Sequence, residues 1–170
     1  MSKKSSKKPV KATVVVPAFD KKNAQAFADL IFSNKGGMIS CVKLCDGDLQ
    51  NGKDGKRTMH CAVGEAYYTF VNPSLKSVLQ KDRNANEYQS KHSVTVVGST
   101  AAAIDALVEV AKLKNDTEQN RAKLAQALDN CVSSNDNGDI TDPDDELLTY
   151  IERSRNVAKT WTAEVVPLLK

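Results

Sequence analysis

A stretch of small, polar and acidic residues in the C-terminal half has the composition of a calcium-binding loop. Residues 133–144 read SSNDNGDITDPD, and Gly138 falls at the sixth position, as it does in EF-hand loops. The two ends fit poorly, because Ser133 stands at the first position and the short side chain of Asp144 at the twelfth. We therefore interpret the stretch as a polar turn ahead of a helix that begins at Pro143.

Cysteine and histidine gather in a second place. Cys41, Cys45, His60 and Cys61 are residue types that bind zinc or act in nucleophilic catalysis. On a strand, Cys41 and Cys45 would stand about 13 Å apart, too far for one ion. His60 and Cys61 would point to opposite faces of the strand. We predict neither a zinc site nor a catalytic pair, and expect all four cysteines, Cys131 included, to be reduced thiols.

The segment Gly98-Ser99-Thr100 lies between a predicted strand and a predicted helix. Backbone N–H groups in such a turn can bind a phosphate. The segment lacks the glycine pattern of dinucleotide-binding turns and the Gly-Lys-Ser/Thr of a P-loop, and a glycine before a capping hydroxyl is also an ordinary helix start. It remains an alternative site for a nucleotide or phosphate ester, with His60 or His92 as acid or base.

Two acids, Asp105 and Glu109, are spaced to lie on one helix face and could bind magnesium together with Glu65 or Asp116. Both are expected to project away from the apolar stripe of their helix, toward solvent. A solvated helix face therefore explains the pair, and the sequence predicts no metal site, no cofactor and no catalytic residue.

The clearest charge feature is the N-terminal segment, residues 1–11, called the arm below. It reads MSKKSSKKPVK, has no acid, and contains five lysines: Lys3, Lys4, Lys7, Lys8 and Lys11. Of the net charge of +3, the arm contributes +5, which leaves −2 for the remainder. Its composition predicts disorder, and its lysines can neutralise phosphates of nucleic acid without reading base sequence.

Apolar patterns predict the elements that would position these residues. Runs of β-branched residues predict strands over 12–16 and 93–97, and residues 38–45 and 57–71 favour strands around a Gly-rich loop. A helix through residues 60–70 is the competing interpretation of that last region.

Helical periodicity predicts four further elements. They are a helix over 21–33 capped by Asp20, one over 101–113, one from a capping box at Asp116 and Gln119 to about residue 132, and one over 143–159.

Strands in the first half and helices in the second predict an α+β fold. We expect a single domain over residues 12–170, in which a small mixed or antiparallel sheet packs with three to four C-terminal helices. A mostly α-helical fold is the alternative.

No apolar run is long enough to cross a bilayer, and no signal-peptide pattern follows the first lysines. The expectation is a cytoplasmic protein without membrane contact. Binding or assembly is favoured over catalysis, with an accessory protein that contacts nucleic acid through its arm as the leading hypothesis. The alternatives are an enzyme acting on nucleotides or phosphate esters around residues 98–100, and a protein–protein interaction module that uses residues 161–169. Oligomeric state does not follow from the sequence.

Overall fold

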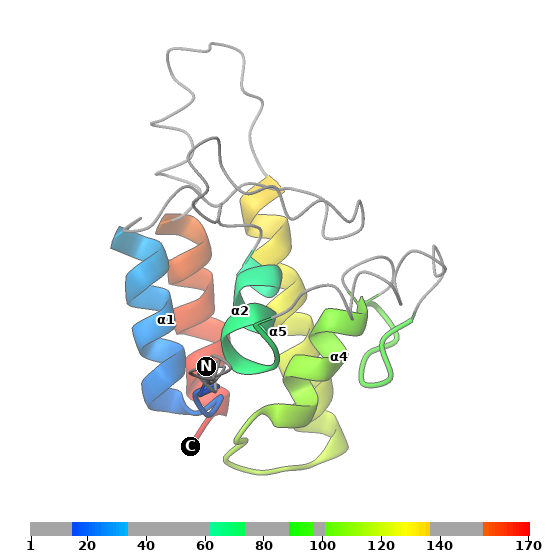
Figure 1. Cartoon of the computed structure of the whole chain (residues 1–170). Helices are drawn as coiled ribbons and strands as arrows, with labels where there is room; N and C mark the ends of the chain where they lie inside the picture. The colour runs from blue at the N-terminus through cyan, green and yellow to red at the C-terminus, as the bar shows by residue number, and fades with distance from the viewer. Residues whose placement is uncertain (1–14, 34–61, 74–88, 97–100, 137–154) are drawn as a thin grey trace, which may run out of the picture.

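The computed structural model describes residues 15–33, 62–73, 89–96, 101–136 and 155–170. Within these ranges every regular element is helical (Figure 1). The α-helices are α1 (Lys21–Ser33), α2 (Ala62–Phe70), α4 (Ala101–Val110) and α5 (Glu118–Asp136). A C-terminal helical segment is α-helical over 155–160, then forms a π turn, η2 (Trp161–Val165), and a 3-10 turn, η3 (Val166–Leu168).

The expected α+β fold is wrong for the part of the chain described, which is mostly α and matches the stated alternative. Residues 65–70, rich in strand formers, belong to α2 instead. The buried residues Val63, Ala66, Tyr67 and Phe70 recur at helical spacing, because this face packs against α4 and α5. Tertiary packing thus overrides the strand preference of the aromatic residues. The strand expected over 38–45, and the part of the 57–71 prediction before residue 62, lie outside the described residues.

The β-branched run at 93–97 does not form a strand over its described residues, 93–96. The Ser93 hydroxyl accepts a hydrogen bond from the Thr95 N–H (3.3 Å) and also contacts the Thr95 hydroxyl. Such local hydroxyl–backbone bonds compete with strand pairing. A backbone bond from Ser90 N–H to the Val96 carbonyl (2.9 Å) closes the loop, and only Val96 enters the core.

The first β-branched run also lacks strand structure where it is described. Val15 is 85% exposed and Val16 is 37% exposed, and the chain enters the core only at Phe19. No sheet in the described residues offers these valines an apolar face to cover, so their strand preference has no packing to support it.

The predicted helix over 21–33 is confirmed with its cap. The Asp20 carboxylate accepts a hydrogen bond from the Asn23 N–H at 2.9 Å, which satisfies one of the free donors of the first turn. The predicted apolar face is the buried one and comprises Ala24, Phe27, Ala28 and Ile31.

The helices predicted over 101–113 and from Asp116 are present as α4 and α5, but α4 ends at Val110, before its predicted end, and Ala111 pairs with Phe19 in an isolated β-bridge instead. Ile104, Leu107 and Val108 of α4 are buried as expected, as are Leu124, Leu128 and Cys131 of α5. The cap of α5 differs from the prediction, because the Thr117 hydroxyl, and not Asp116, accepts from the Asn120 N–H at 3.2 Å. Asp116 is engaged with Arg121 instead.

The helix predicted over 143–159 is described only from residue 155, and from there it continues past its predicted end into the π turn. Trp161 of this turn is fully buried. Its ring lies against Phe27 (centroids 4.7 Å apart), and its indole N–H donates to the Ala24 carbonyl at 3.0 Å. Trp161 therefore joins the C-terminal segment to α1, and these two helices run side by side in Figure 1.

None of the helices in the described ranges combines the length and the apolar character needed to cross a membrane.

Replacing Trp161 with Ala should lower the free energy of unfolding by about 3–5 kcal/mol, because a large aromatic side chain and its hydrogen bond leave the core. The measurement is urea unfolding followed by circular dichroism. Thr162→Ala, at the adjacent exposed position, is the control and should stay within about 0.5 kcal/mol of wild type. Equal stability of the two variants would contradict this account of the core.

Candidate nucleic-acid interface

Three segments of the chain that are far apart in sequence meet at one end of the bundle. Backbone hydrogen bonds run from Lys112 N–H to the Phe19 carbonyl (2.8 Å) and from Lys170 N–H to the Lys112 carbonyl (2.9 Å). Two more run from Lys21 N–H to the Lys170 carbonyl and from Lys114 N–H to the Leu168 carbonyl, both 3.0 Å. Figure 1 shows the start of α1, the connection between α4 and α5, and the C-terminus at this same end.

Side chains alternate between core and solvent where these segments pair. Phe19, Leu113 and Leu169 take part in isolated β-bridges and are buried. In extended backbone, neighbouring side chains point to opposite sides, so the lysines beside these apolar residues face outward. Together with the first two residues of α1, they form a group that we call the basic end: Lys21, Lys22, Lys112, Lys114 and Lys170, all exposed.

Acids that lie close to the basic end have hydrogen-bond partners of their own. Asp29, which lines one pocket together with three of these lysines, accepts from the Gln25 side-chain N–H at 3.0 Å. Asp20 caps α1, and Asp116 forms two hydrogen bonds with Arg121, at 2.7 and 3.1 Å. The Arg121 hydrogen bond lowers the pKa of Asp116 below its ordinary value, and the charges of Arg121 and Lys170 lower it further. No ion pair between described residues involves a lysine of the basic end.

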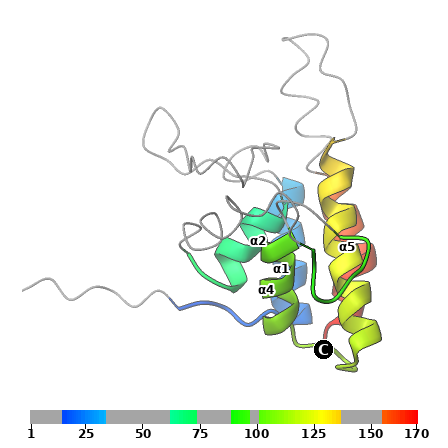
Figure 2. The same ribbon diagram turned by 90° about the vertical axis from the view of Figure 1, so that its right-hand side faces the viewer.

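The chain leading back to the arm leaves the bundle at the basic end. Phe19 is 1% exposed, whereas Val15 is 85% exposed, and Figure 2 shows the segment ahead of α1 extending away from the helices. The predicted arm lysines, Lys3, Lys4, Lys7, Lys8 and Lys11, lie outside the described residues.

A second polar group ties the loop 89–96 to α4. The Asp105 carboxylate accepts hydrogen bonds from the Ser90 hydroxyl (2.6 Å) and the Lys91 N–H (2.9 Å). Asp105 is only 5% exposed, so the expectation that it projects to solvent is wrong. The loop covers this part of α4 and supplies the donors that make a buried carboxylate acceptable.

His92 ties the same loop to α4 and α5. Its Nε2 lies 2.8 Å from Glu109 and its Nδ1 lies 3.1 Å from Glu118. Each ring nitrogen of His92 therefore lies within hydrogen-bond distance of one carboxylate. The His92 side chain is 7% exposed, against 54% for Glu109 and 71% for Glu118. Glu109 thus faces solvent as predicted, while it holds the histidine.

These contacts join the loop 89–96 to α4 and α5. The Ser90 hydroxyl donates to Asp105 and accepts from the His92 backbone N–H (3.2 Å), and these are the bonds that position it. The two His92 nitrogens meet different carboxylates on opposite edges of the ring, so the three groups cannot converge on one ion. Within the described ranges, no group of three or more His, Cys, Asp or Glu residues could hold a metal.

The remaining predicted sites lie mostly outside the described residues. Residues 98–100 are among these, although α4 begins directly after them and the segment ahead of them is not a strand. Cys41, Cys45, His60 and Cys61 are outside as well. Of the candidate calcium loop, residues 133–136 are the last turn of α5, so this helix extends beyond its predicted end.

Glu65, considered above as a possible magnesium ligand, is buried in α2.

The thiol of Cys131 is buried in the core. Burial raises the pKa of the Cys131 thiol well above its ordinary value, and the nearby charge of Glu164 raises it further. The thiolate is therefore disfavoured, so Cys131 is a packing residue of α5 and not a reactive one.

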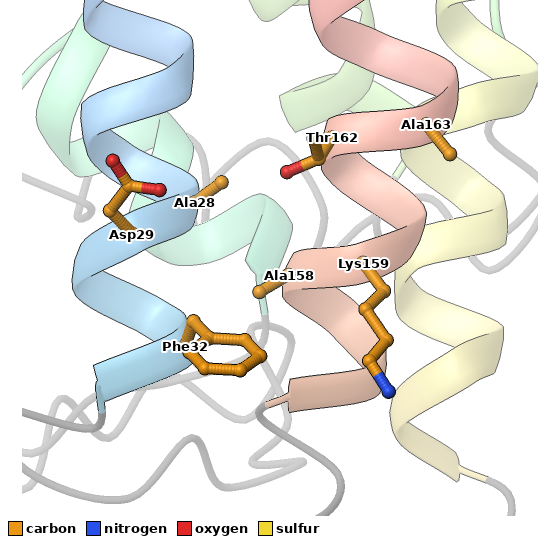
Figure 3. Close-up of a pocket in the computed structure, with 7 residues that line it drawn as sticks. All are labelled: Ala28, Asp29, Phe32, Ala158, Lys159, Thr162 and Ala163. Atoms are coloured by element: carbon orange, nitrogen blue, oxygen red, sulfur yellow. The ribbon is translucent and has the colours of Figure 1, made fainter.

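A shallow groove of about 320 Å³ lies between α1 and the C-terminal segment (Figure 3). Ala28, Ala158 and Ala163 make much of its lining, with Asp29 and Lys159 on its opposite sides. The groove has no convergent set of acids, bases or nucleophiles.

The basic end was not predicted from the sequence. The local signal was present, because Lys112-Leu113-Lys114 alternates polar and apolar residues directly after a helix. That alternation places the two lysines in a cluster only because Phe19 and Leu169 pair with the neighbouring residues 111 and 113. A pattern within one segment does not reveal pairing between distant segments.

The contact between His92 and Glu109 should be visible in a double-mutant cycle. His92→Leu keeps an apolar side chain in the loop, and Glu109→Gln removes the charge; we expect a coupling free energy of about 1 kcal/mol. Urea unfolding of the two single variants, the double variant and wild type gives this value. A coupling near zero would show that the contact does not hold the loop.

Asp129 should destabilise the protein at neutral pH, because burial raises the pKa of its carboxyl above the ordinary 3.8. The folded state then binds the proton more tightly than the unfolded state, so this carboxyl favours folding increasingly as pH falls through the raised value toward 3.8. Asp129→Asn should therefore be more stable than wild type at neutral pH, with a difference that narrows at about pH 4.

Urea unfolding at the two pH values tests this, with Asp116→Asn as a control of opposite sign. The pKa of Asp116 is lowered, so its charged form favours folding and its removal should destabilise the protein at neutral pH. A difference in unfolding free energy between Asp129→Asn and wild type that grows as the pH is lowered would contradict a raised pKa for Asp129.

Comparison of the chain with protein-family models, with curated proteins and with solved structures finds no match. The charges and contacts of the described residues are therefore the basis for a functional assignment.

Proposed function

We propose that this chain is a small non-enzymatic binding protein that contacts nucleic acid through its arm. The observation that carries the proposal is the charge of residues 1–11, which hold five lysines and no acid. Each lysine that neutralises a phosphate releases condensed counterions, and this gain does not depend on base sequence. Binding of this kind is non-specific and weakens steeply as salt rises.

The described structure supports this proposal through the place where the chain ahead of Phe19 leaves the bundle. The chain ahead of Phe19 leaves the core beside the exposed lysines of the basic end. A polyanion drawn to the arm would meet a positively charged surface there, and not an acidic one that would repel it. Charges within about 10 Å reinforce one another at ordinary salt concentrations.

The enzyme hypothesis gains no support from the polar groups in the described ranges. Asp105 is occupied by donors from the loop 89–96, and the ring of His92 by two carboxylates. These contacts join secondary-structure elements and leave no paired acid and base facing a cavity. Ahead of the alternative site at residues 98–100, the described residues 93–96 do not form the strand on which its interpretation as a phosphate turn depended.

The interaction-module hypothesis placed the surface for a protein partner at residues 161–169. Trp161, Val165 and Leu169 are instead fully buried and fill the core between α1, α5 and the connection after α4. This segment therefore holds the bundle together and offers little apolar surface to a partner.

Deleting residues 1–11 should weaken binding to a short fluorescent DNA duplex at least about tenfold at low salt. The slope of log affinity against log salt should become shallower by up to about 0.9 for each phosphate that the arm no longer neutralises. Fluorescence anisotropy over a range of salt concentrations measures both quantities.

The matched control replaces all five arm lysines with Arg, which keeps the charge and should keep the binding. Thermal unfolding of the deleted chain checks that the bundle is intact. Equal affinity and equal salt slope for the deleted and full-length chains would overturn the proposed function.

A further inference from the structure

We infer that the basic end is a second, folded part of the same interface and binds the phosphate backbone of double-stranded nucleic acid. The inference rests on the proposed function and extends it, because it assigns binding residues in the bundle and selects the duplex as the partner. The residues are Lys21, Lys22, Lys112, Lys114 and Lys170.

The basic end is a fixed arrangement of charges. Lys112 donates its backbone N–H to Phe19 and accepts from Lys170 through its carbonyl, and Lys170 in turn accepts from the Lys21 N–H. Three segments are thereby locked to one another, and buried Phe19, Leu113 and Leu169 anchor them from below. Lysines on such a framework lose less conformational freedom on binding than lysines on a mobile chain, because their backbones are already ordered.

The positive charge at this end is available to a partner. Its five lysines are exposed and make no ion pair with another described residue. Asp20 and Asp116, the acids beside them, are engaged in the α1 cap and with Arg121. A phosphate approaching the basic end therefore meets five lysines that form no ion pair with another described residue.

The side chains around the basic end favour a duplex over a single strand. Proteins that bind single strands stack bases on exposed aromatic rings. The exposed large apolar residues of the described ranges include only one aromatic, Phe32. It lies eleven residues along α1 from Lys21, which is about 16 Å, at the other end of the helix. Contact through phosphates alone, without stacking, suits a duplex whose bases are covered.

The arm and the basic end would act together, since the described residues 15–18, which lead back to the arm, leave the bundle at this surface. Once the arm has bound a duplex, phosphates of the same duplex are held close to the body lysines at a high effective concentration. The second contact then adds affinity even though it is weak when it acts alone. Both parts should contribute to the salt dependence of the intact chain.

The test compares two double variants of the full-length chain with the same loss of charge. Lys112→Gln with Lys114→Gln removes two cations of the basic end. Arg155→Gln with Lys159→Gln removes two exposed cations from the opposite part of the C-terminal segment. The first variant should bind a labelled DNA duplex about tenfold more weakly at low salt, with a salt slope shallower by up to about 1.8. The second should bind nearly as wild type does.

The outcomes separate the inference from the proposed function. If arm deletion weakens binding but the two double variants bind alike, the role of the basic end is overturned while the arm keeps its role. If arm deletion has no effect, the proposed function fails first. If an unlabelled single strand of the same length displaces the duplex as well as an unlabelled duplex does, the assigned partner is wrong. Thermal unfolding of both variants confirms that they are folded.

Discussion

The position of Phe19 is the constraint on which much of the described structure depends. Its ring stacks on Phe70 of α2 (centroids 4.6 Å apart) and lies 5.8 Å from the ring of Trp161. Its backbone carbonyl, at the same time, accepts the Lys112 N–H. One residue thus joins the aromatic core to the strand-like pairing at the bundle end. Because the ring cannot leave the core without exposing a large apolar area, the segments paired with its backbone are held in place too.

Buried apolar residues also determine where charged side chains of each sign gather in the described residues. Acids and their partners meet where α4, α5 and the loop 89–96 come together, and there the ring of His92 and the guanidinium of Arg121 each lie between two acids. Like charges gather at the basic end, where burial of the neighbouring apolar residues sets their positions. Electrostatic attraction did not assemble that group, and the repulsion within it is a cost that the core offsets. Surfaces of this kind are suited to receiving a polyanion.

Helical periodicity was enough to predict α1, α4 and α5, because each has one apolar face with a spacing near 3.6 residues. The prediction failed where strands were inferred from residue type alone, without the packing of the neighbouring residues. Tyr67, Tyr68 and Thr69 favour strands in isolation, yet they follow the helical packing of Val63 and Ala66. For the candidate interface, the arm was visible as composition, whereas the body lysines depend on pairings between residues about 90 and 150 positions apart in the chain. Asp105 was misplaced for a related reason, since only the folded loop shows which side of α4 is covered.

The π turn at Trp161–Val165 sets how the chain end is rotated relative to the helix that precedes it. The Val166 N–H donates to the Trp161 carbonyl, five residues back, so the turn holds one residue more than an α-helical turn would. If this turn closed into a regular α-helical turn and kept all its residues, everything after it would rotate by about 100°. Leu169 would then leave its pairing with Leu113, and Lys170 would turn away from Lys112. The wide turn therefore sets the rotational phase of the chain end, on which the anchoring of Leu169 and the position of Lys170 at the basic end both depend.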